Sequence, residues 1–180
     1  MGRFVVLLRG VNLAGRNRVS MPALREALED ADFNDVATYV QSGNVVLTSR
    51  KSAKRVGTDV ERLLAERFDL DVRVVVRTRA ELAAVVEGDP FAKIASDPKR
   101  YQVTFLESPL DADIVRKLEA VATESERVKH VGREVYAWHP DGVGRSKLAV
   151  LLSGKGLGVT ATARNWKTVT QLLALADAGD

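Results

Sequence analysis

The order of apolar patterns over residues 1–78 is the feature that most limits the folds open to this chain. A continuous apolar run from Phe4 to Leu8 is typical of a strand buried on both faces. Ser20 and Pro22 then introduce a stretch with apolar residues at helical spacing, from Leu24 to Ala31. Two short strands, a second helix and an alternating strand follow at 36–40, 45–49, 56–68 and 72–76.

This order of strand, helix, strand, strand, helix, strand predicts a ferredoxin-like split βαβ unit. Right-handed crossovers place both helices on one face of a four-stranded antiparallel sheet, with strand order 4-1-3-2. Arg73 and Arg77 alternate with valines in the last strand. That alternation is typical of a half-exposed edge strand.

The second half repeats the pattern less clearly. A capping box at Thr78 to Glu81 opens a helix, and a connector rich in proline and charge leads to a strand from Tyr101 to Leu106. Next we expect a helix from Ser108, a hairpin from Val128 to Trp138, a helix near 146–152, a glycine-broken stretch at 153–162 and a last helix from about 165 to 176. The chain is therefore expected to be an α+β protein with two related α/β halves, which we interpret as an internal duplication. The domains would be a ferredoxin-like half at 1–78, a helix and connector at 79–100, and a second half with a C-terminal helix at 101–180.

Composition excludes several classes of protein. The chain of 180 residues is 46% hydrophobic, enough to bury a core. It has no cysteine, so it can form neither a disulfide framework nor a thiolate metal site. Its start lacks the pattern of a signal peptide, and no run reaches the roughly 18 apolar residues of a membrane span. We expect a cytoplasmic protein that does not contact a membrane.

Positive charge is concentrated near the two ends of the chain. The net charge is only +3, but Met1 to Arg25 and Gly142 to Ala176 contain no acidic residue. The first segment has five arginines, and the second has Arg145, Lys147, Lys155, Arg164 and Lys167. Such segments indicate an anionic partner, although abundant arginine alone would also produce them.

A polar turn, Gln41 to Asn44, separates the two strands of the first hairpin. The predicted topology places this turn beside the loop from Arg9 to Arg18, at one edge of the sheet. The loop leads into a helix N-terminus, where free N–H groups favour an anion. Ser42 and Asn44 therefore either brace the turn and loop or contact a ligand.

Four ordered stretches carry a family resemblance: "LLRGVNLAGRNRVSM", "TYVQSGNVVLTS", "GREVYAWHPDGVGRSKL" and "TATARNWKTVTQLL". Together they resemble the bacterial family catalogued as domain of unknown function 1697, over essentially the whole chain. The resemblance implies a two-part α/β protein with ferredoxin-like elements, and no established activity. The positions matching the family are Arg9, Gly10, Asn12, Met21, Tyr39, Ser42, Gly43, Asn44, Gly132, Arg133, Tyr136, Ser146, Lys147, Thr162, Arg164, Asn165 and Trp166. Ala14 stands where the family more usually has glycine.

In the string "TARNWKT", Thr162 or Asn165 can cap the last helix, and the helix start carries Arg164, Trp166 and Lys167. This set suits a phosphate with an attached base. The alternative is that Trp166 packs into an interface between the halves while Arg164 pairs with a carboxylate. Lys147 either contacts the ligand or is simply solvated.

Other motifs argue against specific chemistries. The strings "GVGRSKL" and "SGKGLG" lack the spacing of a triphosphate-binding loop. The third strand, "NVVLTS", has no aromatic residue, which disfavours base stacking on the first sheet. His130 and His139 show no metal-binding spacing, so we expect structural roles for both and neither metal nor cofactor.

Three functional hypotheses remain from the sequence. The first is a binder of a phosphate-bearing ligand, a nucleotide or RNA, in a basic polar cleft. Its ligand-binding residues would be Arg9, Asn12, Ser42, Gly43, Asn44, Arg133, Ser146, Lys147, Arg164, Asn165 and Trp166. The second is an enzyme acting on a phosphorylated small molecule, with Glu134 or Asp141 transferring a proton. The third is a protein interaction module without a ligand. A homodimer is compatible with each of them.

Overall fold

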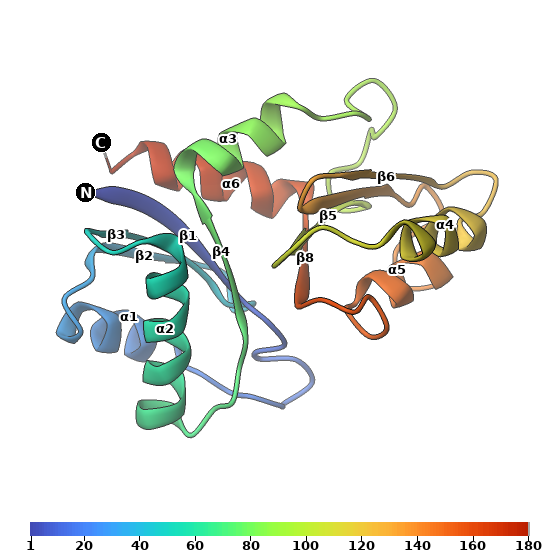
Figure 1. Ribbon diagram of the computed structural model, residues 1–180. Coiled ribbons are helices and arrows are strands. Elements are labelled where there is room, and N and C mark those ends of the chain that lie inside the picture. The colour runs from blue at the N-terminus through green and yellow to red at the C-terminus, as the bar shows by residue number, and fades with distance from the viewer. Residues whose placement is uncertain (180) are drawn as a thin grey trace. The chain divides into compact units, whose positions relative to one another are not determined.

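The computed structural model describes residues 1–179, and it divides the chain into two compact units. The first comprises Met1–Ala84 with the end of the chain from Gln171, and the second is Val85–Thr170. The divisions fall inside two helices, α3 (Arg79–Glu87) and α6 (Trp166–Asp177). Each unit contains one four-stranded antiparallel sheet (Figure 1). The predicted α+β fold with two similar halves is confirmed.

The first unit has the predicted order of elements. Its elements are β1 (Gly2–Leu8), α1 (Met21–Asp30), β2 (Asn34–Tyr39), β3 (Asn44–Ser49), α2 (Ala53–Phe68), β4 (Val74–Thr78) and the start of α3. The sheet order is β2-β3-β1-β4, which confirms the predicted 4-1-3-2 arrangement. The side chain of Ser20 accepts the amide of Ala23 and caps α1, as the sequence indicates.

Helices α1 and α2 share one core with one face of this sheet. Phe4, Val6 and Leu8 of β1 belong to the same buried cluster as Leu24 and Leu64. Gly57 lies where α2 approaches β4, and a Cβ atom at that position would be 3.3 Å from Cγ2 of Val76. The helix therefore accepts a residue with poor helix propensity because the contact with the strand is close.

Edge strand β4 differs from its prediction in one respect. Arg77 was expected on the exposed face of a half-exposed strand, but its side chain is 1% exposed. Its Nη1 donates to the backbone oxygen of Val76 at 3.0 Å. The alternating pattern gave the strand correctly, but it does not distinguish a solvated face from a covered one.

The second unit repeats this architecture. Its elements are β5 (Tyr101–Leu106), α4 (Ala112–Val121), β6 (Arg127–Val131), β7 (Glu134–Trp138), α5 (Lys147–Leu152), β8 (Ala161–Asn165) and the start of α6. The strand order is β6-β7-β5-β8. Leu106, Leu118, Val135 and Leu148 belong to one buried cluster that joins this sheet to α4 and α5. Among the described residues, no helix is long and apolar enough to cross a membrane.

Two predictions about the second unit are corrected. Strand β8 was not expected, because its "ATARN" sequence lacks the large β-branched residues typical of strands. Helix α4 begins at Ala112 after Asp111, rather than at Ser108. The proline-containing stretch before Asp111 therefore precedes the helix instead of forming its first turn.

Candidate functional site

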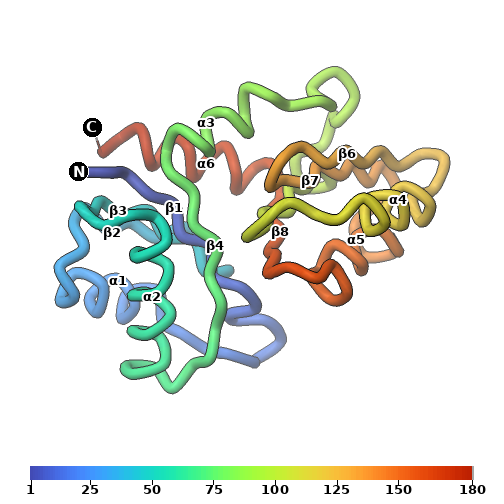
Figure 2. The backbone as a smooth tube through the Cα atoms, viewed as in Figure 1, coloured from blue at the N-terminus to red at the C-terminus, as the bar shows by residue number. Residues whose placement is uncertain are grey.

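The loop between β1 and α1 and the turn between β2 and β3 meet at one edge of the first sheet (Figure 2). The backbone amide of Leu8 donates to the oxygen of Gly43 at 2.8 Å. The side-chain amide of Asn12 donates to the backbone oxygens of Gln41 and Val19, at 2.7 and 3.0 Å. The juxtaposition expected from the topology is therefore confirmed, and Asn12 is the side chain that fastens the loop to the turn.

Gly43 and Asn44 have structural reasons to occupy the turn. Gly43 has φ +80°, and a Cβ atom there would lie 2.5 Å from Cγ2 of Val11 and 2.7 Å from Cβ of Leu8. The Asn44 side chain is fully buried and donates to the backbone oxygen of Tyr39 and to Oγ of Ser42. These contacts correspond to the bracing interpretation of the turn, while Gln41 and Ser42 remain exposed to solvent.

The loop itself is held in shape by its own backbone and side-chain contacts. The amide of Asn12 donates to the oxygen of Asn17, and the side chain of Asn17 donates to the oxygen of Gly10, both at 3.0 Å. Asn12, Ala14 and Asn17 all have positive φ. Ala14, at φ 47°, holds a left-handed conformation that glycine would adopt without strain.

Three arginines of this braced loop have different degrees of exposure. Arg16 and Arg18 are exposed and Arg9 is half-buried. Within residues 1–179, no ion pair joins any of these three to an acidic side chain, whereas Arg55 and Arg62 of α2 both pair with Asp59. The loop therefore carries positive charge that no carboxylate of the described residues pairs with.

Arg164 has a different setting from the one that the sequence predicts. It lies in strand β8 rather than at a helix start, and its side chain is 8% exposed. Its Nη1 donates to Oγ1 of Thr162 at 2.7 Å and to the oxygen of Ala163 at 2.8 Å. Burial lowers the pKa of the guanidinium to about 10, because removing water disfavours the charged form.

The two residues after Arg164 have clear structural contacts. Oδ1 of Asn165 accepts the amide of Thr168 at 2.9 Å, which caps α6. The ring of Trp166 stacks on Tyr101, with centroids 4.9 Å apart and planes at 23°. Within the second unit, the tryptophan therefore packs against another aromatic residue.

The remaining predicted site residues come from separate elements of the second unit. Arg133 lies in the β6–β7 turn, where its backbone oxygen accepts the amide of Leu106 at 2.9 Å. Ser146 caps α5 through the amide of Ala149. Lys147, the first residue of α5, is exposed.

A buried polar cluster that the sequence did not indicate joins Glu126, His139 and Ser146. Nδ1 of His139 lies 2.9 Å from Oε1 of Glu126, and the hydroxyl of Ser146 donates to that same oxygen. Oε2 of Glu126 accepts the amide of Thr123 at 3.0 Å. Burial by itself would raise the pKa of Glu126, but the hydrogen bonds from His139, Ser146 and Thr123 outweigh it, so the pKa is lowered.

The geometry of this cluster differs from that of a catalytic triad. A triad serine donates to the imidazole, which acts as its base. Here the serine hydroxyl and the imidazole both contact one carboxylate oxygen, so the imidazole is not placed to activate the hydroxyl. Nε2 of His139 is buried and has no hydrogen-bond partner among the described residues. The cluster instead ties the start of α5 to the ends of the β6–β7 hairpin.

The second sheet has aromatic residues on both of its central strands, whereas β3 of the first sheet has none. Tyr101, Phe105 and Tyr136 lie on its central strands, β5 and β7, but all three are buried. The hydroxyl of Tyr136 donates to the oxygen of Val85 at 2.8 Å. The Phe4 ring on β1 is buried as well. Recognition of RNA by base stacking requires exposed rings, so the central strands of neither sheet provide the required surface.

Glu134 and Asp141 are the carboxylates that the sequence offered for proton transfer. Asp141 is exposed and accepts a hydrogen bond from Ser125 at 2.7 Å, and Glu134 lies at the start of β7. No cluster of acidic and histidine side chains in residues 1–179 has the composition of a metal site.

Comparisons with known proteins identify the family without an activity. Residues 1–136 match the family described as "Protein of unknown function (DUF1697)". The chain belongs to this family. A search of curated proteins finds no match. The fold is similar to that of the conserved bacterial protein SP0830 from Streptococcus pneumoniae, with 23% identity and a TM-score of 0.79, over 97% of this chain and 98% of that one.

Proposed function

We propose that this protein binds a phosphate-bearing ligand, a nucleotide or a segment of RNA, at the edge of the first sheet. The binding surface would be the β1–α1 loop and the neighbouring β2–β3 turn. The observation that supports this proposal is a braced loop with three arginines, Arg9, Arg16 and Arg18, that pair with no carboxylate in the part of the chain that the structure describes. Guanidinium groups hydrogen-bond phosphate oxygens with favourable geometry and strength.

The backbone of the loop strengthens this proposal. Asn12 and Asn17 hold the loop in shape, because Asn12 bonds Val19 near its end and Asn17 bonds Gly10 near its start. Binding a ligand to this loop therefore costs less conformational entropy than binding it to a flexible loop. The exposed Gln41 and Ser42 add polar groups beside the arginines. Arg164, Asn165 and Trp166 have contacts within the second unit that account for them, so the proposal does not use these residues.

A direct test compares two variants of equal charge. The Arg16→Gln, Arg18→Gln double variant should weaken binding of nucleotides or a short single-stranded RNA by about tenfold or more, the equivalent of at least about 1.4 kcal/mol. The matched control is the Arg25→Gln, Arg116→Gln double variant. Both of its arginines are exposed and paired with carboxylates on their own helices.

The measurements are fluorescence anisotropy with labelled RNA and thermal melts with a panel of nucleotides and sugar phosphates. Equal losses in the two double variants would contradict a site on the loop. Absence of binding to the whole panel at low salt would contradict the proposed function and leave the interaction-module hypothesis in first place.

A further inference from the structure

A small cavity opens beside a buried carboxylate on the helical side of the first unit. It has a volume of about 160 Å³ and is bordered by residues of α1, α2 and the segments that lead to and from the β2–β3 hairpin. Drug-sized ligand sites occupy roughly 300 to 1,000 Å³, so this cavity suits only a small molecule. None of its lining residues belongs to the loop or turn of the proposed phosphate site.

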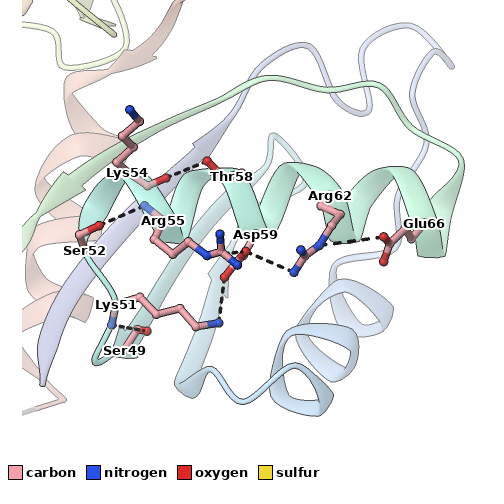
Figure 3. Close-up of polar contacts among 9 residues, drawn as sticks. All are labelled: Ser49, Lys51, Ser52, Lys54, Arg55, Thr58, Asp59, Arg62 and Glu66. Atoms are coloured by element: carbon pink, nitrogen blue, oxygen red, sulfur yellow. Dashed lines mark hydrogen bonds and ion pairs between the residues drawn. The ribbon is translucent and has the colours of Figure 1, made fainter.

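Asp59 lines this cavity. Figure 3 shows Lys51, Arg55 and Arg62 gathered around its side chain. Its side chain is 5% exposed, and it accepts from Nζ of Lys51 at 2.9 Å and from Nη2 of Arg62 at 3.2 Å. Nε of Arg55 lies 3.1 Å from Oδ1 of Asp59. Asp30, Glu66 and Arg67 also line the cavity, and Nη2 of Arg67 pairs with Oδ2 of Asp30 at 3.0 Å. With Arg55 included, four cations and three carboxylates surround the cavity, which leaves a surplus of one positive charge.

The cations remain open to solvent although they are fixed in place. The side chains of Lys51 and Arg62 are 40% and 57% exposed, and both line the cavity. Arg62 has a further acidic neighbour in Glu66, but the separation is 4.0 Å. An anion entering the cavity would meet an ammonium and a guanidinium that Asp59 has already oriented, which lowers the entropic cost of binding it.

The other wall of the cavity is apolar. Ala27, Phe33 and Leu63 are buried core residues that also line it. The ammonium of Lys51 lies 5.0 Å from the centroid of the Phe33 ring, so the charged and apolar walls meet at this pair. A ligand that fits both walls has a negative head and a short hydrocarbon tail.

We propose that this cavity binds a small organic carboxylate, with its head between Lys51 and Arg62 and its tail against Phe33 and Leu63. The carboxylate group accepts hydrogen bonds from both cations, and the tail leaves water for the apolar wall. The site is independent of the proposed phosphate site, because the two share no residue.

The test uses butyrate as the probe and butyramide as its uncharged counterpart. Binding of each compound is monitored through the amide signals of the full chain in two-dimensional NMR. Butyrate should give saturable shifts confined to α1, α2 and the residues around Phe33, with a Kd on the order of 1 mM. Butyramide should give no saturable shift. Equal shifts with both compounds, or none with butyrate, would overturn the proposal.

Variants separate a binding role from a structural one. Lys51→Gln and Arg62→Gln should each weaken butyrate binding by about tenfold, while Arg25→Gln on α1, which also loses an exposed paired arginine, should bind as the wild type does. The spectrum of each variant reports whether it remains folded. The Arg16→Gln, Arg18→Gln variant should keep butyrate binding, so failure at one site is distinguishable from failure at the other. Unchanged affinity in a folded Arg62→Gln variant would contradict the assigned contact.

Discussion

Two hairpin glycines show how much the cost of adding one methyl group depends on its surroundings. Gly43 and Gly132 both have positive φ, at 80° and 57°. A Cβ atom on Gly43 would overlap Val11 and Leu8, whereas nothing lies within 4 Å of one on Gly132. The two positions share backbone strain and differ in packing.

We therefore expect Gly43→Ala to destabilise the protein more than Gly132→Ala. Left-handed backbone strain costs a non-glycine residue roughly 1–2 kcal/mol, and it applies to both variants. Overpacking adds about 1–3 kcal/mol at Gly43 only. Urea denaturation of the two variants measures the difference, and equal losses would show that Val11 and Leu8 move aside freely.

The second prediction at residue scale concerns Glu126 and acid. Its lowered pKa means that the folded protein holds the ionised carboxylate more favourably than the unfolded chain, whose ordinary value is 4.5. This stability is fully present above that value and is lost as the pH falls through the lower folded pKa. Glu126→Gln should therefore destabilise the protein most near neutral pH, and the difference from wild type should shrink below about pH 4.

The control for this measurement is Glu124→Gln, two residues away on the exposed side of the same turn. It should change stability by less than about 0.5 kcal/mol at every pH. Chemical denaturation across the acid range gives both curves. A constant difference between Glu126→Gln and wild type would contradict the role assigned to the ionised carboxylate.

At the scale of elements, the sequence predicted the helices and strands whose residue patterns depend on near neighbours in the chain. Alternation, helical spacing and capping residues gave every element of the first half, and Thr78 and Glu81 form the reciprocal capping box that was expected. Strand β8 was missed because small and polar residues fill it. Its place comes from pairing with β5, where Ala161 lies opposite Leu106, and such a long-range contact has no local pattern.

The candidate sites likewise separate into features that local sequence patterns predict and features that depend on long-range contacts. The meeting of loop and turn could be predicted because it depends only on strand order. His139 and Ser146 lie 13 and 20 residues after Glu126, and nothing in the sequence links the three before the fold is known. The cavity beside Asp59 likewise depends on how α2 faces Phe33, which spacing alone does not give.

Asn165 provides a prediction at the scale of one helix. It belonged to the ligand set expected from the sequence, and its observed contact caps α6. Asn165→Ala should destabilise the protein by about 0.5–2 kcal/mol, while Asn165→Asp should retain most of the stability because aspartate also caps well. Thermal melts compare the two variants. Equal stability of Asn165→Ala and wild type would show that the cap is dispensable.

At the scale of the whole molecule, the two halves agree in strand register. At the end of β1, the backbone amide of Leu8 donates to the oxygen of Gly43. At the end of β5, the backbone amide of Leu106 donates to the oxygen of Arg133. Arg77 of β4 pairs with Val5 of β1, and Arg164 of β8 pairs with Val103 of β5. Both arginines are buried, and both donate to the backbone oxygen of the preceding residue. The sequence singled out only Arg164, because the correspondence becomes visible only in the sheet registers.

The last prediction separates a local site from the charge of the whole molecule. A net charge of +3 and a sequence pI of about 9.3 attract polyanions weakly without any specific contact. Each phosphate neutralised on a single strand adds about 0.7 to the slope of log affinity against log salt. If Arg16 and Arg18 each contact one phosphate, the Arg16→Gln, Arg18→Gln variant should show a slope shallower than wild type by about 1.4. The Arg25→Gln, Arg116→Gln variant loses the same charge and should keep the wild-type slope. RNA titrations over a range of salt concentrations measure all three slopes, and a parallel change in both variants would assign the binding to overall charge instead of the loop.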